Sequence, residues 1–387
     1  MANILTLNKI AKVGLDRFGD GYACSDSMEN PDAVLVRSAA MHDMELPGSL
    51  LAIARAGAGV NNIPLDKCAE KGIVVFNTPG ANANAVKELV IGAMRMSSRN
   101  LLPATAWAKG LKGNGDQVGK MVEKGKSQFV GPELKGKKLG VVGLGAIGVL
   151  VANAAEALGM EVLGYDPYLS VDGALKLSPK IKHVTSTKDI FEQSDYITIH
   201  VPLTPDTKDL VNAESIAMMK DGVRVFNFAR GGLVNSADIK AAVQSGKVAG
   251  YVIDFPDDEV LDVDGIIAIP HLGASTPESE DNCAMMAVDE IKAYLENGSV
   301  THSVNYPDID AGPVLDKRIC VLHKNVPNII SKLSSVISGE GLNIENMLSK
   351  SKGDYAYSIV DVSGELSDSA KTLIETIDDV IRVRFIG

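Results

Sequence analysis

Short apolar runs alternate with amphipathic segments through residues 1–100. Apolar runs of strand length, separated by segments with helical spacing, are typical of a parallel sheet with crossover helices. The expected strands are Asn3–Thr6, Asp32–Arg37, Leu51–Ala56 and Ile73–Asn77. An apolar helix pattern follows at Ala85–Arg99. The pattern therefore predicts a first α/β domain.

The alternation resumes at Lys137, after a polar stretch at Lys109–Gly136 that we interpret as a connecting segment. The later strands are expected at Tyr196–Val201, Val223–Phe228, Gly250–Asp254 and Ile266–Pro270. Pro277–Leu295 then has the spacing of one long helix, which could carry the chain back to the first domain.

The last part of the chain, residues 318–387, has a different order: strand, helix, strand, strand, helix, strand. Turn-forming residues at Pro307–Pro313 separate it from the long helix. We therefore expect two doubly wound, Rossmann-like α/β domains and a small C-terminal α+β domain. The predicted boundaries are residues 1–100 with 283–305 for a discontinuous first domain, 101–282 for the second domain and 318–387 for the tail.

Composition excludes several classes of protein. The chain has 387 residues and a formal net charge of −11, which argues against nucleic acid as a partner. It lacks an apolar run of membrane-spanning length, and its N-terminus lacks the layout of a signal peptide. No CxxC pair occurs among the four cysteines, Cys24, Cys68, Cys283 and Cys320. We therefore expect reduced thiols in a cytoplasmic protein, and we expect neither a structural metal nor a disulfide framework.

One glycine-rich turn carries the clearest functional signal. The apolar run ending at Val142 leads into Gly143, Gly145 and Gly148, and an apolar helix pattern follows. In this setting the first glycine permits a tight turn, the second lets the backbone approach a pyrophosphate, and the third allows close packing of helix and strand. The pyrophosphate then meets free N–H groups at the helix N-terminus. The alternative is an ordinary glycine-rich turn, which this context disfavours.

The choice of dinucleotide follows from Asp166, eighteen residues after Gly148 and at the end of the next apolar run. A carboxylate at this position accepts hydrogen bonds from ribose hydroxyls and repels a 2′-phosphate. Pro167 and Tyr168 follow, so no cation stands beside the acid. The sequence thus predicts NAD rather than NADP. Asp166 could equally begin an Asp-Pro turn, and the two roles are compatible.

Three side chains after later strands suit the oxidation of an alcohol. His271 could accept the hydroxyl proton, Arg230 could bind a carboxylate with two parallel hydrogen bonds, and Glu259 could orient His271. Open α/β sheets bind ligands at this carboxyl edge. Each residue also has an ordinary structural interpretation: a strand-end histidine, an arginine in a solvated turn, and an acidic loop that includes Asp257 and Asp258.

Taken together, these segments resemble the D-isomer-specific 2-hydroxyacid dehydrogenases. The matching motifs are the glycine turn with Asp166, His200–Thr207, Asn227–Gly232, Asp254-Phe-Pro and Pro270–Thr276. Arg55–Asn62 and Asn77–Asn82 resemble substrate-domain motifs of the same family. The resemblance covers essentially the whole chain. It implies an NAD-dependent dehydrogenase that acts on a phosphorylated 2-hydroxy acid and assembles as a homodimer or homotetramer.

The resemblance assigns roles residue by residue. Arg230, Glu259 and His271 match the catalytic positions. Further NAD contacts are implied at Ala146, Ile147, Pro202, Thr207, Ala229, Asp254 and Gly273. Substrate contacts are implied at Arg55, Ala58, Gly59, Val60 and Asn82. The family usually reads Asp-Val-Phe-Pro-x-Glu, and this chain lacks one residue before Phe255. Spacing from Arg230 selects Glu259 as the partner of His271, whereas alignment on Phe-Pro selects Asp258; we prefer Glu259.

The tail resembles an ACT domain in Cys320–Pro327 and in the turn Gly341–Ile344. ACT domains of related dehydrogenases bind an amino acid, often serine, between paired subunits. The resemblance places His323, Asn325 and Asn343 at the effector positions. Asn328 replaces the glycine that usually follows Pro327 in such domains. The alternative to an effector-binding domain is a tail that serves only as a structural dimerisation module.

Two other functions remain in view. One is a glyoxylate or hydroxypyruvate reductase of the same family. The other is a non-catalytic, NAD-sensing dimeric binding protein, against which the joint presence of Arg230, Glu259 and His271 argues.

Overall fold

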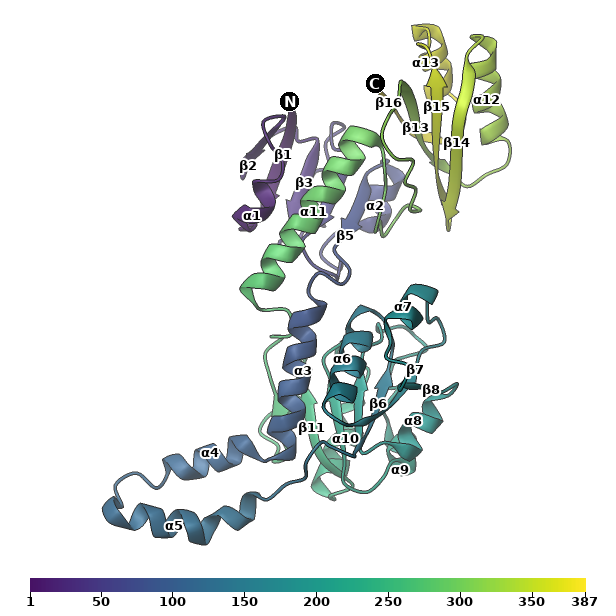
Figure 1. The fold of residues 1–387 in the computed structure, drawn as a ribbon. Helices are drawn as coiled ribbons and strands as arrows, with labels where there is room; N and C mark the ends of the chain where they lie inside the picture. Colours follow the sequence, from purple (N-terminus) through teal and green to yellow (C-terminus); the bar gives the residue numbers. More distant parts are fainter. The chain divides into compact units, whose positions relative to one another are not determined.

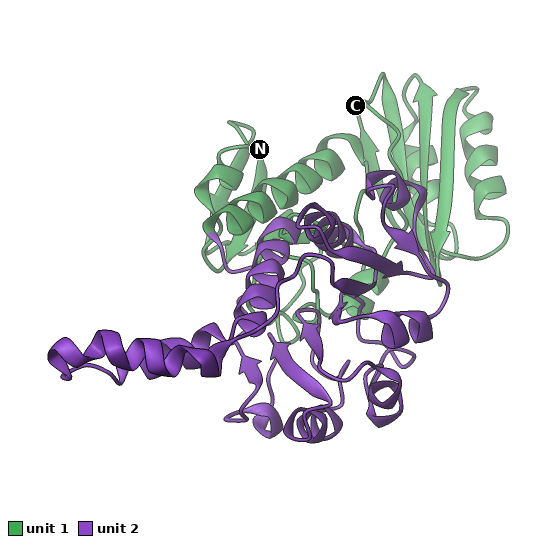
Figure 2. Cartoon of the chain, turned by 60° about the horizontal axis from the view of Figure 1, so that its bottom comes forward, with its two compact units in different colours: residues 1–82, 277–387 green, residues 83–276 purple.

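The computed structural model describes residues 1–387. The chain divides into two compact units, one of residues 1–82 with 277–387 and one of residues 83–276 (Figure 2). Each unit has its own parallel sheet, and the first unit also contains the tail. None of the helices combines the length and apolar character that a membrane span requires.

The N-terminal sheet has five parallel strands in the order β2-β1-β3-β4-β5. These are β1 (Ala2–Leu7), β2 (Tyr22–Ser25), β3 (Ala33–Val36), β4 (Ala52–Arg55) and β5 (Val74–Asn77). The sequence predicted all of them except β2. Successive residues of β4 belong to different hydrophobic cores on the two faces of the sheet. Ala52 and Ala54 pack on one face, and Ile53 packs on the other. Burial on both faces is typical of a parallel sheet.

The helices that accompany this sheet are α1 (Lys12–Leu15), α2 (Leu65–Glu70) and α11 (Pro277–Asn297). The long helix α11 lies along the N-terminal sheet in Figure 1, although it follows that sheet only after the whole of the second unit in sequence. Its buried residues Ala284, Val288 and Ile291 join the core that contains Ala52 and Ala54. The expectation that this helix returns the chain to the first domain is confirmed.

The second unit contains a parallel seven-stranded sheet in the order β12-β11-β10-β9-β6-β7-β8. Its strands are β6 (Lys138–Val142), β7 (Glu161–Tyr165), β8 (Lys182–His183), β9 (Tyr196–Ile199), β10 (Val223–Asn227), β11 (Val248–Ile253) and β12 (Ile266–Ala268). In chain order, β6, β7 and β8 follow one another toward one edge of the sheet, and β9, β10, β11 and β12 follow one another toward the other edge. The strand order therefore reverses between β6 and β9, where doubly wound sheets bind nucleotides.

Helices cover both faces of this sheet. They are α3 (Ala83–Ser98), α6 (Ala146–Ala157), α7 (Val171–Lys176), α8 (Thr187–Gln193), α9 (Ala213–Met218) and α10 (Ser236–Gln244), with the short helix η3 (Asp258–Val260). Several begin at a side-chain cap: Ser170, Ser186, Asn212 and Asn235 each accept a hydrogen bond from a backbone N–H of the first turn. Such caps satisfy donors that the helix leaves free.

The predicted connecting segment is largely helical. Residues 109–136 form η1 (Gly115–Gln117), α5 (Val118–Gly125) and η2 (Lys126–Phe129). Together with the preceding α4 (Leu101–Lys109), these elements project from the sheet as an arm (Figures 1 and 2). None of these four elements has a fully buried residue. The segment links the preceding helices to β6, as expected of a connector, but the sequence did not predict its helices.

The tail has the predicted order β13 (Lys317–Lys324), α12 (Ile329–Gly339), β14 (Asn343–Lys352), β15 (Tyr355–Ser363), α13 (Asp368–Glu375) and β16 (Val380–Ile386). Its antiparallel sheet has the order β14-β15-β13-β16. In β13, Ile319 and Val321 face the two tail helices. Cys320 and Leu322 face the opposite way and join the core of the N-terminal sheet and α11. The tail is thus packed against the N-terminal sheet and the helix that covers it.

The units divide at 82/83 and 276/277, whereas the sequence predicted domain boundaries at 100/101 and 282/283. The helix α3 explains the first difference. Its residues Val86 and Val90 pack with Val149 of α6 in the core of the second unit. A contiguous pattern of strands and helices cannot show which sheet its last helix covers.

Candidate functional site

The glycine turn lies at the point where the strand order reverses. Gly143 follows β6 with a φ of 94°, and a Cβ there would lie 2.6 Å from the carbonyl oxygen of His200, which follows β9. A Cβ on Gly148 would lie 1.9 Å from the Gly143 carbonyl oxygen. By contrast, a Cβ on Gly145 would meet no atom within 4 Å. Two glycines are therefore required by packing, while Gly145 leaves open space before α6.

Ala146 and Ile147 form the first turn of α6, directly after Gly145. Their backbone N–H groups belong to the positive end of a twelve-residue helix, which favours a phosphate. The open space at Gly145 lets a pyrophosphate approach this end. The residues present therefore fit a dinucleotide.

Asp166 follows β7 beside this turn and is half-buried. One of its carboxylate oxygens accepts a hydrogen bond from the Leu144 N–H at 2.8 Å, and the other accepts one from the Tyr168 N–H at 2.8 Å. The acid thus forms the Asp-Pro turn and is also bound to the glycine turn. A carboxylate oxygen can accept more than one hydrogen bond, so ribose hydroxyls can still bind here.

Pro202, Thr207 and Ala229 lie in the loops after β9 and β10. The Thr207 hydroxyl donates to the Pro202 carbonyl at 2.6 Å and closes the first loop. The Ala229 N–H donates to the Asn227 side chain at 3.2 Å in the second. Both loops lie at the carboxyl edge of the sheet, where the predicted NAD contacts would be made.

Asp254 follows β11 and is 1 % exposed. Its carboxylate accepts hydrogen bonds from the Leu272 N–H at 2.6 Å and the Gly273 N–H at 2.9 Å. Burial raises the pKa of this carboxyl group, and the two N–H donors and His271 oppose that shift. The carboxylate therefore braces the loop that carries His271. The resemblance implied a contact with NAD and did not reveal this bracing role.

The structure brings His271 and Arg230 together around one aromatic ring. The His271 ring centroid lies 4.3 Å from that of Phe255, and the Arg230 guanidinium carbon lies 5.6 Å from the same ring. Both polar side chains are exposed, and His271 has a φ of 51°, an uncommon backbone conformation held by the brace from Asp254. Phe255 was not predicted as a site residue. The missing residue after Asp254 is the signal that could have drawn attention to it.

Glu259 does not contact His271 in this structure. It lies exposed in η3, and its nearest cation is Lys240 of α10 at 3.9 Å. Asp258 is also exposed, and Asp257 accepts a hydrogen bond from the Ser236 hydroxyl at 2.6 Å. No hydrogen bond or ion pair joins His271 to any of the three acids. The pairing with Glu259 or Asp258 therefore stays a prediction.

The predicted substrate residues lie in the first unit, at the carboxyl ends of β4 and β5. Arg55 ends β4, and its Nε donates to the Arg37 carbonyl at 3.0 Å. In the next loop, Ala58, Gly59 and Val60 donate no backbone hydrogen bond within the protein. Asn77 supports this loop by donating to the Ala58 carbonyl at 2.6 Å. Three consecutive free N–H groups form a suitable site for a carboxylate. Asn82 is the last residue of the first of the two segments that make up this unit.

The three effector residues do not converge within one chain. His323 is 4 % exposed, and its ring bonds the Lys324 carbonyl and the Ser358 hydroxyl. Asn325 donates to the Gly353 carbonyl at one end of the tail sheet. Asn343 pairs with Ser363 at the other end. An effector site that uses all three would need two chains. Asn328 has a φ of 72° and so keeps the left-handed conformation for which a glycine would be suited.

Residues 92–273 match the family model of the D-isomer specific 2-hydroxyacid dehydrogenase NAD-binding domain. A D-3-phosphoglycerate dehydrogenase of Haemophilus influenzae is 32% identical over 88% of this chain and 82% of its own length. The chain belongs to the D-isomer specific 2-hydroxyacid dehydrogenases. The family predicted from the sequence is confirmed.

Other relatives differ in length. A D-3-phosphoglycerate dehydrogenase of Methanocaldococcus jannaschii is 36% identical over 73% of this chain, which spans about half (53%) of that relative. Among solved structures, an NAD⁺-bound 3-phosphoglycerate dehydrogenase of Entamoeba histolytica is 27% identical with a TM-score of 0.59. The match covers 79% of this chain and 98% of that structure, so the two-sheet architecture is shared.

Proposed function

We propose that the chain oxidises 3-phospho-D-glycerate to 3-phosphohydroxypyruvate with NAD, the first step of serine biosynthesis. The observation that carries the proposal is the placement of Arg230 and His271 around Phe255, at the sheet edge that also bears the glycine turn. The curated relatives are named for this reaction. The proposed compartment is the cytoplasm, in keeping with four cysteines that form no disulfide.

Bound NAD supplies a hydride acceptor for C2 of the substrate. The His271 imidazole accepts the C2 hydroxyl proton, so the alcohol loses one hydride and one proton and becomes a ketone. The Arg230 guanidinium binds the substrate carboxylate and stabilises charge that develops on the C2 oxygen. In the first unit, Ala58, Gly59 and Val60, whose N–H groups donate no backbone hydrogen bond, are the proposed contacts for a substrate carboxylate. Arg55 is the proposed contact for the substrate phosphate.

A substrate panel tests the reaction. We expect NADH formation with 3-phosphoglycerate, measured while a transaminase removes the product, and a much lower kcat/KM with D-glycerate. Faster turnover of glyoxylate or hydroxypyruvate with NADH would instead assign the reductase activity. NAD binding without turnover of any of these compounds would favour the non-catalytic sensor.

Replacing Asp166 by alanine is expected to raise the KM for NAD about tenfold or more, because hydrogen bonds to a charged group are worth about 1.5–3 kcal/mol. The difference in KM between NAD and NADP should become smaller, since the carboxylate no longer repels the 2′-phosphate of NADP. Steady-state kinetics with both cofactors measure the effect. Asp172→Ala, an exposed acid at the start of α7, serves as the matched control. A parent protein that prefers NADP would contradict the assignment.

We propose further that two tails together bind serine through His323, Asn325 and Asn343. Regulation requires serine to bind one arrangement of the chain more tightly than another. Deleting the tail is a poor test, because Cys320 and Leu322 belong to a core shared with α11. Point variants leave this core in place.

In calorimetry, Asn325→Ala is expected to weaken serine binding about tenfold, because it removes a hydrogen bond to a charged ligand. Serine should inhibit the parent enzyme and inhibit the variant correspondingly less. Asn346→Ala, an exposed asparagine on β14, is the control. If serine gives no heat with the parent and millimolar serine leaves its rate unchanged, the tail has only an assembly role.

We also propose that the chain forms a homodimer or homotetramer. The arm of α4 and α5 supports this, because it exposes Leu101, Leu102, Met121 and Val122. Apolar surface on a projecting helix is typical of an interaction site. Light scattering of the parent and of Leu102→Lys tests the assembly.

A further inference from the structure

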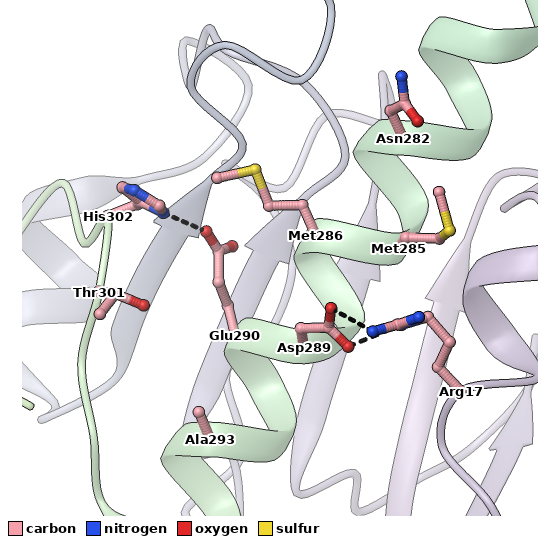
Figure 3. A pocket seen from close by; sticks show the side chains of 9 residues that line it. All are labelled: Arg17, Asn282, Met285, Met286, Asp289, Glu290, Ala293, Thr301 and His302. Carbon is pink, nitrogen blue, oxygen red and sulfur yellow. Dashed lines mark hydrogen bonds and ion pairs between the residues drawn. The ribbon is translucent and has the colours of Figure 1, made fainter. Parts of the chain in front are cut away.

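A pocket of about 540 Å³ lies beside α11 in the unit of residues 1–82 and 277–387. Its walls include Met286, Glu290 and Ala293 of α11 and Thr301 and His302 of the segment that follows (Figure 3). None of these residues was predicted from the sequence as part of a site. The pocket is also formed within one unit, by residues other than those assigned above to substrate or NAD.

Glu290 lines this pocket with an incompletely satisfied carboxyl group. The residue is 4 % exposed. Its Oε1 lies 2.8 Å from His302 Nδ1, whereas its buried Oε2 has no hydrogen-bond partner. In Figure 3 the carboxyl group extends between Met286 and Thr301. A buried polar atom without a partner is energetically unfavourable, so a ligand that donates a hydrogen bond to Oε2 would bind favourably.

The charges around Glu290 favour a cation. Asp289 is its neighbour on α11, and Asp308 approaches from the following segment, where it accepts hydrogen bonds from the His302 and Ser303 N–H groups. Burial, followed by the charges of Asp308 and Asp289, raises the pKa of Glu290 to about 9. The guanidinium of Arg17 forms two hydrogen bonds of 2.7 Å with Asp289. The charges of Arg17 and Asp289 therefore offset each other, so Arg17 does not make the pocket suitable for an anion.

The wall opposite α11 is held in place by the tail. Lys352 of β14 donates to the Ser303 carbonyl at 2.7 Å, and Lys350 donates to the Asp308 carbonyl at 3.0 Å. These bonds fix the segment that carries Thr301 and His302. A site with a fixed wall loses little conformational entropy when a ligand binds.

We propose that this pocket binds a small primary ammonium ion. The ammonium group donates hydrogen bonds to Glu290 Oε2 and to the Thr301 hydroxyl, and the carbon chain lies against Met286 and Ala293. A neutral apolar ligand would leave Oε2 without a partner, and an anion would face the carboxyl groups of Glu290 and Asp308.

The proposal makes a specific prediction about pH. The ammonium ion binds the carboxylate form of Glu290, whose fraction rises about tenfold per pH unit below its pKa. The other charged or titratable groups that surround it are His302, Asp289, Asp308, Arg17, Lys350 and Lys352. The apparent Kd should therefore fall about tenfold per pH unit between pH 7 and pH 8 and level off near pH 9.

The test is a titration of the full chain with ethylammonium chloride, without NAD or substrate. Methyl NMR of ¹³C-labelled methionine reports binding at Met286, which Met286→Leu identifies. We expect saturable shifts with ethylammonium and none with ethanol or with sodium chloride at equal ionic strength. Equal shifts with either control, or no saturation with ethylammonium at pH 8, would overturn the proposal.

Glu290→Gln tests the carboxylate directly. Glutamine can keep the contact with His302 but has no charge, so binding should weaken at least tenfold at pH 8 and lose its pH dependence. Glu296→Gln makes the same change on the same helix outside the pocket and should bind like the parent. Thermal unfolding checks the fold, and the Glu290→Gln variant should melt no lower than the parent at pH 8. Unchanged affinity in folded Glu290→Gln would show that the ammonium site does not exist, whatever the outcome of the dehydrogenase assay.

Discussion

Replacing His271 by alanine is expected to lower kcat by about two to four orders of magnitude while NAD still binds, because general acid–base catalysis contributes about that much. The side chain is exposed and rests against Phe255, so its removal leaves the core intact. Single-turnover NADH formation measures the chemical step, and cofactor fluorescence measures NAD binding. His183→Ala, an exposed histidine of β8 in the same unit, is the control and should keep full activity.

Near-normal turnover of His271→Ala would mean that His271 is an ordinary strand-end residue without a catalytic role. Its acid partner is tested by comparing Glu259→Gln with Asp258→Asn. An acid that pairs with histidine stabilises the imidazolium, so loss of the partner should move the acid limb of the kcat/KM profile to lower pH. An effect confined to Asp258→Asn would show that the spacing from Arg230 selected the wrong acid.

The parts of the fold that the sequence predicted are those with strong local patterns. Strands buried on both faces read as continuous apolar runs, so β4, β6 and β9 could be located within a residue or two. The glycine turn could be interpreted in detail, because Gly143 and Gly148 are required by contacts within the same strand-turn-helix unit or with the adjacent strand.

The parts that escaped prediction depend on contacts between distant segments. The strand β2 is short and only partly buried, so its apolar signal is weak. The bracing of the His271 loop by Asp254 joins residues far apart in the sequence. Phe255 contacts Arg230 and His271 only because the loops that follow β10, β11 and β12 lie together at the carboxyl edge of the sheet. Spacing along the chain carries no information of this kind.

The tail shows the same limit. Its order of strands and helices was predicted correctly, yet the sequence treated it as a separate domain. In the structure, Arg384 donates to the Tyr294 and Leu295 carbonyls of α11, and Arg382 donates to the Leu50 carbonyl before β4. Charged residues on an edge strand would ordinarily be assigned to solvent, so only the structure reveals that they bind another domain.

The second large effect is expected at Arg318, on β13 at the junction of the tail with α11. The residue is 1 % exposed, and it forms hydrogen bonds of 2.6 and 3.0 Å with the two carboxylate oxygens of Asp361. Its Nη1 also donates to the Asn297 and Gly312 carbonyls at 2.8 Å. One guanidinium therefore links the end of α11, the linker and two tail strands.

Arg318→Met is expected to destabilise this junction by about 3–5 kcal/mol, because it leaves the carboxylate of Asp361 and several carbonyls without their donor. Hydrogen–deuterium exchange of the β13 and β15 amides measures the local free energy of opening. The control is Lys317→Met, since Lys317 forms an exposed ion pair with Glu365 that should contribute less than about 1 kcal/mol.

A double variant separates the cost of an unpaired charge from the loss of the junction itself. If the unpaired Asp361 carboxylate dominates, Arg318→Met combined with Asp361→Leu should recover part of the loss, because neither charge is then left without its partner. If the bonds to the Asn297 and Gly312 carbonyls dominate, the double variant should exchange as fast as Arg318→Met. If Arg318→Met lowers the free energy of opening no more than Lys317→Met does, both explanations of the role of Arg318 are contradicted. The tail would then be held to α11 by the apolar contacts of Cys320 and Leu322, with Arg382 and Arg384 as its remaining polar links.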